Sequence, residues 1–384
     1  MLRIGVIGYG SRIRTMLQRA GVFEIPYRVV AIGDPRAEEI KGYDDPWLEG
    51  CRYFADGREM VDKADELDGI MVGTRCFMHA DDACRAAARQ VPLFVEKPVA
   101  ITFEQVKRLA ETFEDYRPPV VVSFPLRVTR LAEEVKRLIE ADTIGRIDQV
   151  VAFNDVPYAR GYYSGWYRDH EQTGGLWMQK ATHDLDTLNF LIGQAPAKVF
   201  AMESRRVYGG HKPADLRCGD CQELRTCPES TFNVFYQQMR GDRVRSRGGL
   251  CVFSSAIKHH DSAHALVEYA DGLQANYTQN FFARHKAARR GARLYGYKGT
   301  IDFDWYQNRI QVFSHRTPTV STVEYPYIAH HWGGDEELCY DWLLAMQEGR
   351  PSRCPMSTGI ESALLCLWAR QSAATSQLCA VRLP

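Results

Sequence analysis

The sequence predicts an α/β protein of two domains. A doubly wound parallel sheet comes first, and an α+β domain with an open, mostly antiparallel sheet follows it. Over residues 2–124 short apolar runs alternate with helical patterns, whereas after residue 145 the apolar runs follow one another at hairpin spacing. At 384 residues the chain has the length of two domains. We expect a first domain over 1–125, a second over 126–358, and a C-terminal helical segment, 359–384, that packs back on the first.

The elements of the first domain are predicted from its apolar runs and the residues that interrupt them. A strand over 2–7 leads into a glycine turn and then into a helix from about Arg14 to Ala20. The further expected elements are strands near 29–34, 53–54, 69–74, 91–95 and 120–124, and helices near 57–63 and 80–89. Because strands and helices alternate, the strands are expected to run parallel, and a ligand crevice lies at their carboxyl ends.

The second domain is expected to open with a strand over 146–154. A helix then runs from about Gly174 to Gly193, because apolar residues recur at helical spacing and Gly193 supplies a stop. Strands are expected near 198–203, 262–269, 273–281, 291–297 and 299–303, and a closing helix over 359–376. The hairpin intervals between these strands indicate an open antiparallel sheet.

The composition favours a small-molecule partner. Its 48 basic and 48 acidic residues cancel, so no global charge attracts nucleic acid or an anionic membrane. No apolar run approaches the ~20 residues of a membrane span. The chain enters its first strand without the pattern of a signal peptide, and most of its 11 cysteines sit singly in apolar patterns. We therefore expect a cytoplasmic protein with reduced thiols.

The glycine turn after the first strand has the features of a dinucleotide site. Gly8-x-Gly10, followed by Ser11, Arg12 and Ile13, opens a helix whose N–H groups hold a pyrophosphate, although Gly or Ala is usual in place of Ile13. Asp34 ends the second strand, where the ribose hydroxyls of a dinucleotide are held. Arg36 would instead suit a 2'-phosphate, but Asp34 repels that group. NAD is therefore favoured over NADP.

Later strand ends are expected to complete the cofactor crevice. The residues assigned to it are Thr74, His79, Glu96 and Lys97. A lysine in a crevice beside a cationic nicotinamide should have its pKa lowered by desolvation and like charge, which suits proton transfer near pH 7. The alternative is a Lys97 that pairs with Glu96 in a surface turn.

The helix that begins near Gly174 carries the other candidate catalytic residues. Gln179, His183 and Asp186 follow one another at i, i+4 and i+7, so they share a face, and Lys180 neighbours His183 at i and i+3. A histidine titrates near neutrality and takes a proton from a hydroxyl, while a following acid fixes its tautomer. The alternative for His183 is a histidine with satisfied hydrogen bonds and no catalytic role.

The order of several motifs identifies a family. These motifs are Gly8-x-Gly10, Asp34, Glu96-Lys97-Pro98, Gly174-Gly175 and His183-x-x-Asp186. With them the chain resembles the glucose-fructose oxidoreductase / inositol dehydrogenase / MocA (Gfo/Idh/MocA) family over nearly its whole length. The resemblance implies a Rossmann domain and a substrate domain whose open sheet often serves oligomerisation, so a homo-oligomer, either a dimer or a tetramer, is expected.

The resemblance also implies roles for particular residues. Lys97 and His183 are expected to flank the nicotinamide and the reacting hydroxyl of a sugar or cyclitol. Dehydrogenases of the family commonly carry an aspartate four residues before the histidine, where this chain has Gln179. Because an amide cannot hold a proton, Lys180 is expected to compensate, either as a second acid/base or by gripping a substrate hydroxyl or anionic group.

Substrate contacts are expected from two segments. The loop after the strand at 146–154 is rich in aromatic rings, which stack on the apolar side of sugar rings, so it forms a substrate wall or an oligomer interface. Its candidates are Tyr158, Tyr163, Trp166 and Arg168, and Asp186 is added from the helix. His330, or else its neighbour His331, is a further candidate because Gly333-Gly334 permits close approach.

A polar insert, 212–230, contains Cys218-x-x-Cys221-x5-Cys227, which with Cys251 or His211 has the pattern of a structural zinc site. The alternative is a loop of reduced thiols. Basic runs at 240–247 and 284–290 are typical of solvated loops, and the minority interpretation is an anion pocket.

These predictions lead to an NAD(H)-dependent oxidoreductase that transfers a hydride between the nicotinamide and a ring carbon of a sugar, glycoside or cyclitol. One alternative is an NAD-dependent glycoside hydrolase that works by transient oxidation, elimination, water addition and re-reduction. The other is a non-catalytic, nucleotide-sensing regulator, against which the presence of both Lys97 and His183 argues.

Overall fold

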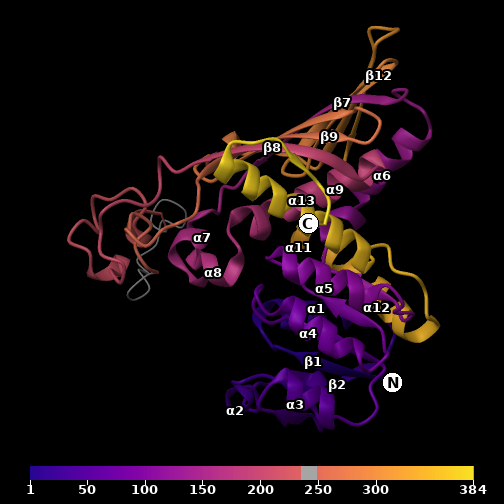
Figure 1. Ribbon diagram of the computed structural model, residues 1–384, viewed down its shortest axis with the longest axis vertical. Coiled ribbons are helices and arrows are strands. Elements are labelled where there is room, and N and C mark those ends of the chain that lie inside the picture. Colours follow the sequence, from indigo (N-terminus) through magenta and orange to yellow (C-terminus); the bar gives the residue numbers. More distant parts are fainter. Residues whose placement is uncertain (235–248, 384) are drawn as a thin grey trace.

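The computed structural model describes residues 1–234 and 249–383. The basic run at 240–247 lies outside the described residues. Two sheets organise the chain, and Figure 1 shows the smaller one in the N-terminal half, with α1 and α4 beside it, and the larger one across the other end of the molecule.

The N-terminal sheet has six parallel strands in the order β3-β2-β1-β4-β5-β6. The strands are β1 Leu2–Ile7, β2 Tyr27–Gly33, β3 Arg52–Phe54, β4 Gly69–Val72, β5 Leu93–Val95 and β6 Val120–Val122. The helices of this half are α1 Ser11–Ala20, α2 Ala37–Ile40, α3 Gly57–Lys63, α4 His79–Ala87 and α5 Phe103–Phe113. The predicted doubly wound sheet is confirmed. Its strand order reverses between β1 and β4, so their carboxyl ends open the crevice where such folds bind ligands.

The second sheet has nine strands in the order β14-β13-β12-β11-β7-β10-β9-β8-β15. The strands are β7 Ile147–Asp155, β8 Pro196–Ser204, β9 Ser262–Tyr269, β10 Gln274–Asn280, β11 Arg290–Gly296, β12 Gly299–Asp304, β13 Arg309–Ser314, β14 Val320–Glu324 and β15 Cys379–Ala380. Neighbouring strands of this sheet pair antiparallel, except β7 with β10, so the predicted open, mostly antiparallel sheet is confirmed. Burial alternates along β9, which indicates that one face packs on the core.

Helices join the two halves into one core. In the second half they include α6 Arg130–Glu140, α7 Arg160–Ser164, α8 His170–Thr173, α9 Thr182–Ile192, α11 Ala329–Trp332, α12 Gly334–Glu348 and α13 Met356–Thr375. Helix α12 packs on α1, and α13 packs on α5, α9 and β8, so the end of the chain contacts both halves. Among the described residues, no helix has both the length and the apolar character that crossing a bilayer requires.

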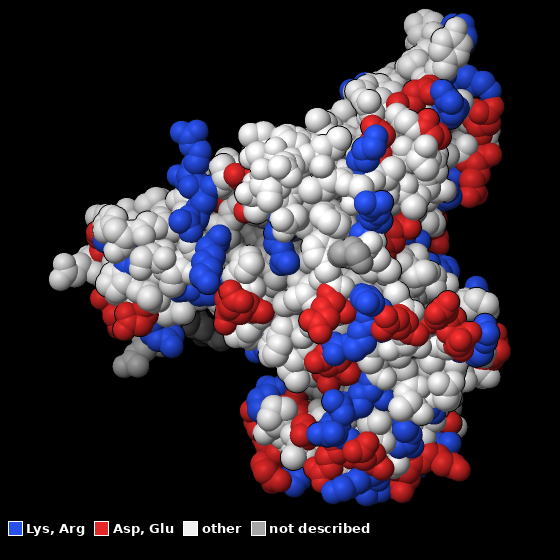
Figure 2. Space-filling view, in the orientation of Figure 1, with Lys and Arg blue, Asp and Glu red and all other residues white. Residues whose placement is uncertain are grey.

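Charged side chains of both signs intermix over the N-terminal half in the face shown in Figure 2, and they are sparser over the sheet around β8 and β9. No region of one sign covers this face. That distribution agrees with the balanced composition and gives no electrostatic footprint for nucleic acid here.

Candidate active site

A cavity of about 870 Å³ lies between the carboxyl ends of the N-terminal strands and the N-terminal part of α9. The structure brings most of the residues predicted from the sequence to its wall. These are Gly8, Gly10, Ser11, Arg12, Asp34, Arg36, Thr74, His79, Glu96, Lys97, Tyr158, Trp166, Gln179, Lys180 and His183. The cavity therefore joins the glycine turn to both candidate catalytic residues.

The glycine turn is held closely against the end of β4. Gly8 has φ +81°, and a Cβ there would lie 2.7 Å from the Thr74 nitrogen, so the turn requires glycine. Ile13, predicted to contact the cofactor, is instead fully buried. A Cβ on Gly73 would lie 2.1 Å from Ile13 Cγ1. The glycine missing from helix α1 is thus compensated by a glycine on the facing strand end, and the close packing of helix and strand is kept.

Asp34 is tied to the same turn. Its carboxylate accepts hydrogen bonds from the Tyr9 N–H and the Arg36 N–H, both at 2.8 Å. The Arg36 guanidinium also lies 3.3 Å from Asp34 Oδ1. Because Arg36 already has this carboxylate as a partner, a 2'-phosphate would have to compete with Asp34 for it, which favours a ribose without that phosphate.

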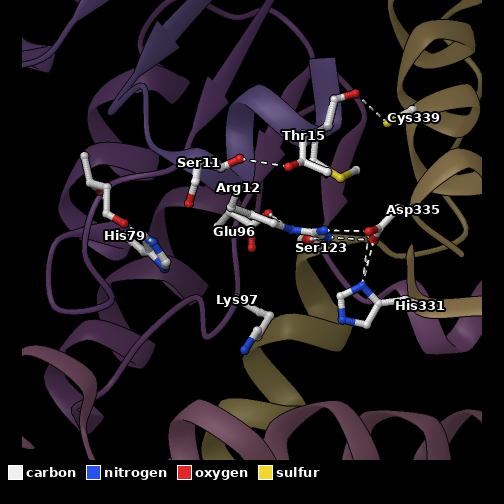
Figure 3. Close-up of polar contacts among 12 residues, drawn as sticks. Ser11, Arg12, Thr15, His79, Glu96, Lys97, Ser123, His331, Asp335 and Cys339 are labelled. Atoms are coloured by element: carbon white, nitrogen blue, oxygen red, sulfur yellow. Dashed lines mark hydrogen bonds and ion pairs between the residues drawn. The ribbon is translucent and has the colours of Figure 1, made fainter. Parts of the chain in front are cut away.

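Arg12 connects four elements at the floor of the cavity. Its guanidinium donates to Glu96 at 3.0 Å, to Ser123 at 3.1 Å and to both oxygens of Asp335 at 2.8 Å. Figure 3 shows this side chain reaching from α1 towards Asp335, with Ser123 beside the contact. The charge of Arg12, predicted to serve the cofactor, is thus already shared between two carboxylates.

Lys97 follows β5 and points towards the π turn Trp177–Ala181 that precedes α9. Its Nζ donates to Gln179 O at 2.8 Å and to Gln179 Oε1 at 3.2 Å. Burial lowers the pKa of Lys97 to about 8. Glu96 pairs with Arg12, so a Lys97–Glu96 pair in a surface turn does not describe this site.

His79 lies between the segment that carries Lys97 and the end of β4. Its ring nitrogens lie 2.8 Å from Pro98 O and 3.1 Å from Thr74 O, and burial lowers its pKa. These contacts tie the segment after β5 to the segment after β4. The ring therefore reaches the cavity as a brace between two cofactor-site segments.

His183 lies in the first turn of α9, which ends at Gly193 with φ +74°. Its side chain is buried, and its pKa is held well below the ordinary range by desolvation and then by nearby Lys97 and Arg290. Its Nδ1 is buried without a partner among the described residues. A neutral imidazole in this position is a proton acceptor of low basicity.

Asp186 does not contact His183. Its carboxylate pairs with Arg127 at 2.6 and 3.1 Å, and both side chains are buried. The prediction that Asp186 contacts substrate or fixes the His183 tautomer is therefore wrong. The helical spacing was correct, but Arg127 lies on the side of α9 that Asp186 faces, away from the cavity.

Lys180 is buried and contacts Tyr158, which is about half exposed (52%) at the cavity wall. Its Nζ donates to Tyr158 Oη at 2.5 Å. Burial alone would raise the pKa of Tyr158, but Lys180 and Arg290 outweigh it and the pKa is lowered. Burial also lowers the pKa of Lys180. Arg290, from β11, is buried and pairs with Asp184 at 2.7 Å. The Asp184 carboxylate therefore neutralises the charge of Arg290, whereas Lys180 has only the Tyr158 hydroxyl as a hydrogen-bond partner among the described residues.

His331, and not His330, lines the cavity. The His330 ring lies 2.5 Å from Arg19 Nη2 on the outside of the molecule. The prediction that His330 contacts substrate is wrong for a backbone reason. Residues 330–332 all have φ near +50°, which is left-handed backbone. In this conformation the side chain of His331, and not that of His330, is directed into the cavity.

Two other predicted substrate residues lie elsewhere. Tyr163 is fully buried in a small apolar cluster, and its hydroxyl donates to His260 O at 2.7 Å. Arg168 is buried and donates to Ser254 Oγ at 3.0 Å. Both serve the packing of the aromatic segment. Trp166 stays at the cavity wall, with the Arg75 guanidinium 3.8 Å from its ring centroid.

The cysteine insert does not form a recognisable metal centre. Cys218, Cys221, Cys227 and Cys251 are free thiols. Within residues 1–234 and 249–383, no group of three or more His, Cys, Asp or Glu side chains is arranged to hold an ion. The predicted structural zinc site is therefore not supported.

Three residues of the site were not assigned a role from the sequence. Arg290 lies in a basic run that is typical of a solvated loop, and Asp335 belongs to none of the motifs identified in the sequence. His331 was only the alternative to His330. In the structure β11 begins at Arg290, one residue before the strand expected near 291–297, so its inward position could not be predicted from the sequence.

The chain matches known proteins over both halves. Residues 2–124 match an oxidoreductase family described by its NAD-binding Rossmann fold, and residues 132–302 match the GFO/IDH/MocA C-terminal domain. YteT of Bacillus subtilis (strain 168), named an oxidoreductase, is 24% identical over 386 residues, 90% of this chain and 89% of YteT. The scyllo-inositol 2-dehydrogenase (NAD(+)) of the same organism is 26% identical over 75% of this chain and 82% of that enzyme.

The fold has solved counterparts. Levoglucosan dehydrogenase, in a complex with NADH and levoglucosan, superposes with a TM-score of 0.74 at 19% identity and covers 99% of both chains. At this identity the likeness concerns the fold.

Proposed function

The chain belongs to the Gfo/Idh/MocA oxidoreductase family, and from that premise we propose that it is an NAD(H)-dependent dehydrogenase acting on a ring hydroxyl of a sugar, glycoside or cyclitol. One observation carries the proposal: Lys97, from the end of β5, and His183, from α9, line the same cavity as the glycine turn. A lysine and a neutral histidine beside a dinucleotide site are the acid/base pair that alcohol oxidation needs.

The residues at the outer end of the cavity fit a dinucleotide. Gly8 and Gly73 leave no room for a Cβ, so backbone approaches the cavity there, and Asp34 lies at the end of β2. NAD, when bound, accepts or returns the hydride. NAD is proposed over NADP because Asp34 repels a 2'-phosphate and already engages Arg36.

The chain's own residues handle the hydroxyl. Neutral His183 accepts the hydroxyl proton. Lys97, while protonated, donates a hydrogen bond to the oxygen that becomes negative as the proton leaves. Gln179 holds Lys97 through its backbone carbonyl and its amide oxygen, and it carries no proton itself.

A second candidate, the NAD-dependent glycoside hydrolase, is favoured by one observation. Elimination from a transiently oxidised ring needs a base besides the group that takes the hydroxyl proton. Tyr158, whose pKa is lowered by Lys180 and Arg290 against the effect of burial, is such a base at the cavity wall.

The deciding experiment incubates the protein with NAD and scyllo-inositol, myo-inositol, levoglucosan, L-sorbose or aryl glycosides in deuterated water. A dehydrogenase forms NADH in proportion to turnover and yields a ketone or lactone. A redox-assisted hydrolase releases the aryl group without accumulating NADH and takes up solvent deuterium at the carbon next to the oxidised one. NAD binding with neither outcome would favour the nucleotide-sensing regulator.

A carbohydrate as substrate, a homo-oligomeric state and a cytoplasmic location stay predictions. Sedimentation of the purified protein at micromolar concentration measures the second of these directly.

A further inference from the structure

A strained backbone segment delivers His331 to the inner cavity. His330, His331 and Trp332 have φ of 55°, 52° and 55°, a left-handed run that residues with side chains rarely adopt. Such conformations persist where the surrounding structure fixes them, and they gather at functional sites. The segment lies directly before α12, so the first turn of that helix anchors it.

Asp335, in that first turn, fixes the His331 ring. His331 Nδ1 lies 3.1 Å from both carboxylate oxygens of Asp335, and the same oxygens accept from Arg12 at 2.8 Å. The carboxylate stays ionised because Arg12 outweighs its burial and holds the pKa of Asp335 far below the ordinary range. An ionised carboxylate only accepts hydrogen bonds, so Nδ1 carries the proton and Nε2 keeps a lone pair. Figure 3 shows the ring held below Asp335, on the same side of Arg12 as Lys97.

His331 stands between His183 and the solvent. The ring centroids of the two histidines lie 6.0 Å apart, a separation that one water bridges. His183 is buried, with 6% of the whole residue exposed, whereas the His331 side chain is partly exposed, at 36% of its own surface. A proton on His183 therefore has a nearby acceptor that reaches water.

We propose that His331, oriented by Asp335 and Arg12, is the group that takes the substrate's proton onward from His183 and releases it to solvent. The proposal rests on the proposed dehydrogenase function. The step balances simply: the substrate hydroxyl loses a proton to His183 and a hydride to NAD, a carbonyl forms, and the proton passes through a bridging water to His331 Nε2 and then to bulk water.

The charges around the two rings favour this direction. His331 faces Asp335, Arg12, Arg290 and His183. Burial lowers the pKa of His331, but Asp335 opposes the shift, whereas the pKa of His183 is held well below the ordinary range by burial and by neighbouring cations with no carboxylate contact. A proton therefore moves from the weaker base to the stronger one. The relay also supplies what the amide of Gln179 cannot, because His331, held by the Asp335 carboxylate, can accept a proton near His183.

The test uses His331→Asn in the protein loaded with NAD. Asparagine tolerates a left-handed backbone but cannot shuttle a proton at neutral pH. With whichever inositol or levoglucosan probe the unmodified protein oxidises, turnover in dilute buffer should fall by about 10- to 100-fold. Added imidazole should restore most of it, since a free base can replace the missing acceptor. NAD affinity and the thermal midpoint should stay close to those of the unmodified protein.

His330→Asn is the matched control, since it makes the same change at the neighbouring left-handed position outside the cavity. It should respond to imidazole no more than the unmodified protein. Full turnover of His331→Asn in dilute buffer, or a loss that imidazole does not reverse, would overturn the relay. If the unmodified protein forms no NADH with any probe, the proposed function fails, and the relay fails with it.

A second measurement identifies the ring nitrogen of His331 that carries the proton. Nitrogen NMR of histidine-labelled protein should show His331 protonated at Nδ1, and Asp335→Asn should shift that signal. A His331 that carries its proton on Nε2 would contradict the proposed acceptor role whatever the turnover.

Discussion

Replacing Lys97 with methionine is expected to abolish turnover and to stabilise the folded protein at neutral pH. Burial lowers the pKa of Lys97 from 10.5 to about 8, so the fold disfavours the charged form by roughly 3 kcal/mol. Methionine fills a similar volume without charge. Against this gain stand the two hydrogen bonds from Nζ to Gln179, about 1–2 kcal/mol together after water replaces them. A net gain of about 1–2 kcal/mol remains.

The pH dependence identifies the cause. Below pH 8 the lysine is charged in both the folded and the unfolded chain, so the whole cost opposes folding. Between pH 8 and 10.5 the folded protein releases the proton first, and the cost shrinks as pH rises; above 10.5 it disappears. The gain from Lys97→Met should therefore be largest at pH 7 and fall towards zero, or reverse, near pH 10.5.

The assay is urea unfolding of the cofactor-free protein at pH 7 and at about pH 10, with tryptophan fluorescence as the signal. Lys63→Met is the control, because Lys63 is 63% exposed and pairs with Glu59 on the surface of α3. It should change stability by less than about 0.5 kcal/mol. A Lys97→Met protein that unfolds at lower urea than the unmodified protein at pH 7, or whose gain is the same at both pH values, would refute the reasoning.

Two further predictions concern the reaction and the cofactor. Lys97→Ala and His183→Ala should each lower turnover by about 100-fold or more, the usual loss for a positioned acid/base, while calorimetry finds NAD affinity nearly unchanged; retained turnover in either variant would remove that residue from the mechanism. Asp34→Ala should weaken NAD binding and narrow the preference over NADP, since it removes the carboxylate that repels a 2'-phosphate. Unchanged NAD affinity, or much tighter NADP binding by the unmodified protein, would contradict the assignment of Asp34.

The N-terminal half was predictable because its signals are local. The glycine turn, the apolar strands and Asp34 occur in an order that fixes a parallel sheet and its crevice. The one misplaced residue there, Ile13, shows the limit of a local motif. The motif expects a glycine at position 13 so that helix and strand can pack closely. Here Gly73, sixty residues later in the chain, leaves that space for the Ile13 side chain, and the contact between the two residues is visible only in the folded structure.

The substrate end was less predictable because its residues depend on tertiary partners. The i, i+4, i+7 pattern correctly put Gln179 and His183 at the cavity. Asp186 instead forms an ion pair with Arg127 and does not reach the cavity. Tyr163 and Arg168 belong to the aromatic loop, yet buried hydrogen bonds turn them away from the cavity. His331 arrives from nearly 150 residues beyond His183, through a left-handed turn that no propensity predicts.

The distribution of charge supports the proposed activation of a hydroxyl by a site that has Gln179 where dehydrogenases of the family commonly have an aspartate. The carboxylates nearest the cavity floor are taken by arginines: Glu96 and Asp335 by Arg12, and Asp184 by Arg290. Lys97 and Lys180 have no carboxylate partner within the described chain, and burial lowers the pKa of both. The positive potential that makes His183 a weak base also stabilises the negative oxygen that forms when the hydroxyl proton leaves. The difficult step is then removal of the proton from His183, which a carboxylate-backed histidine at the cavity edge is suited to perform.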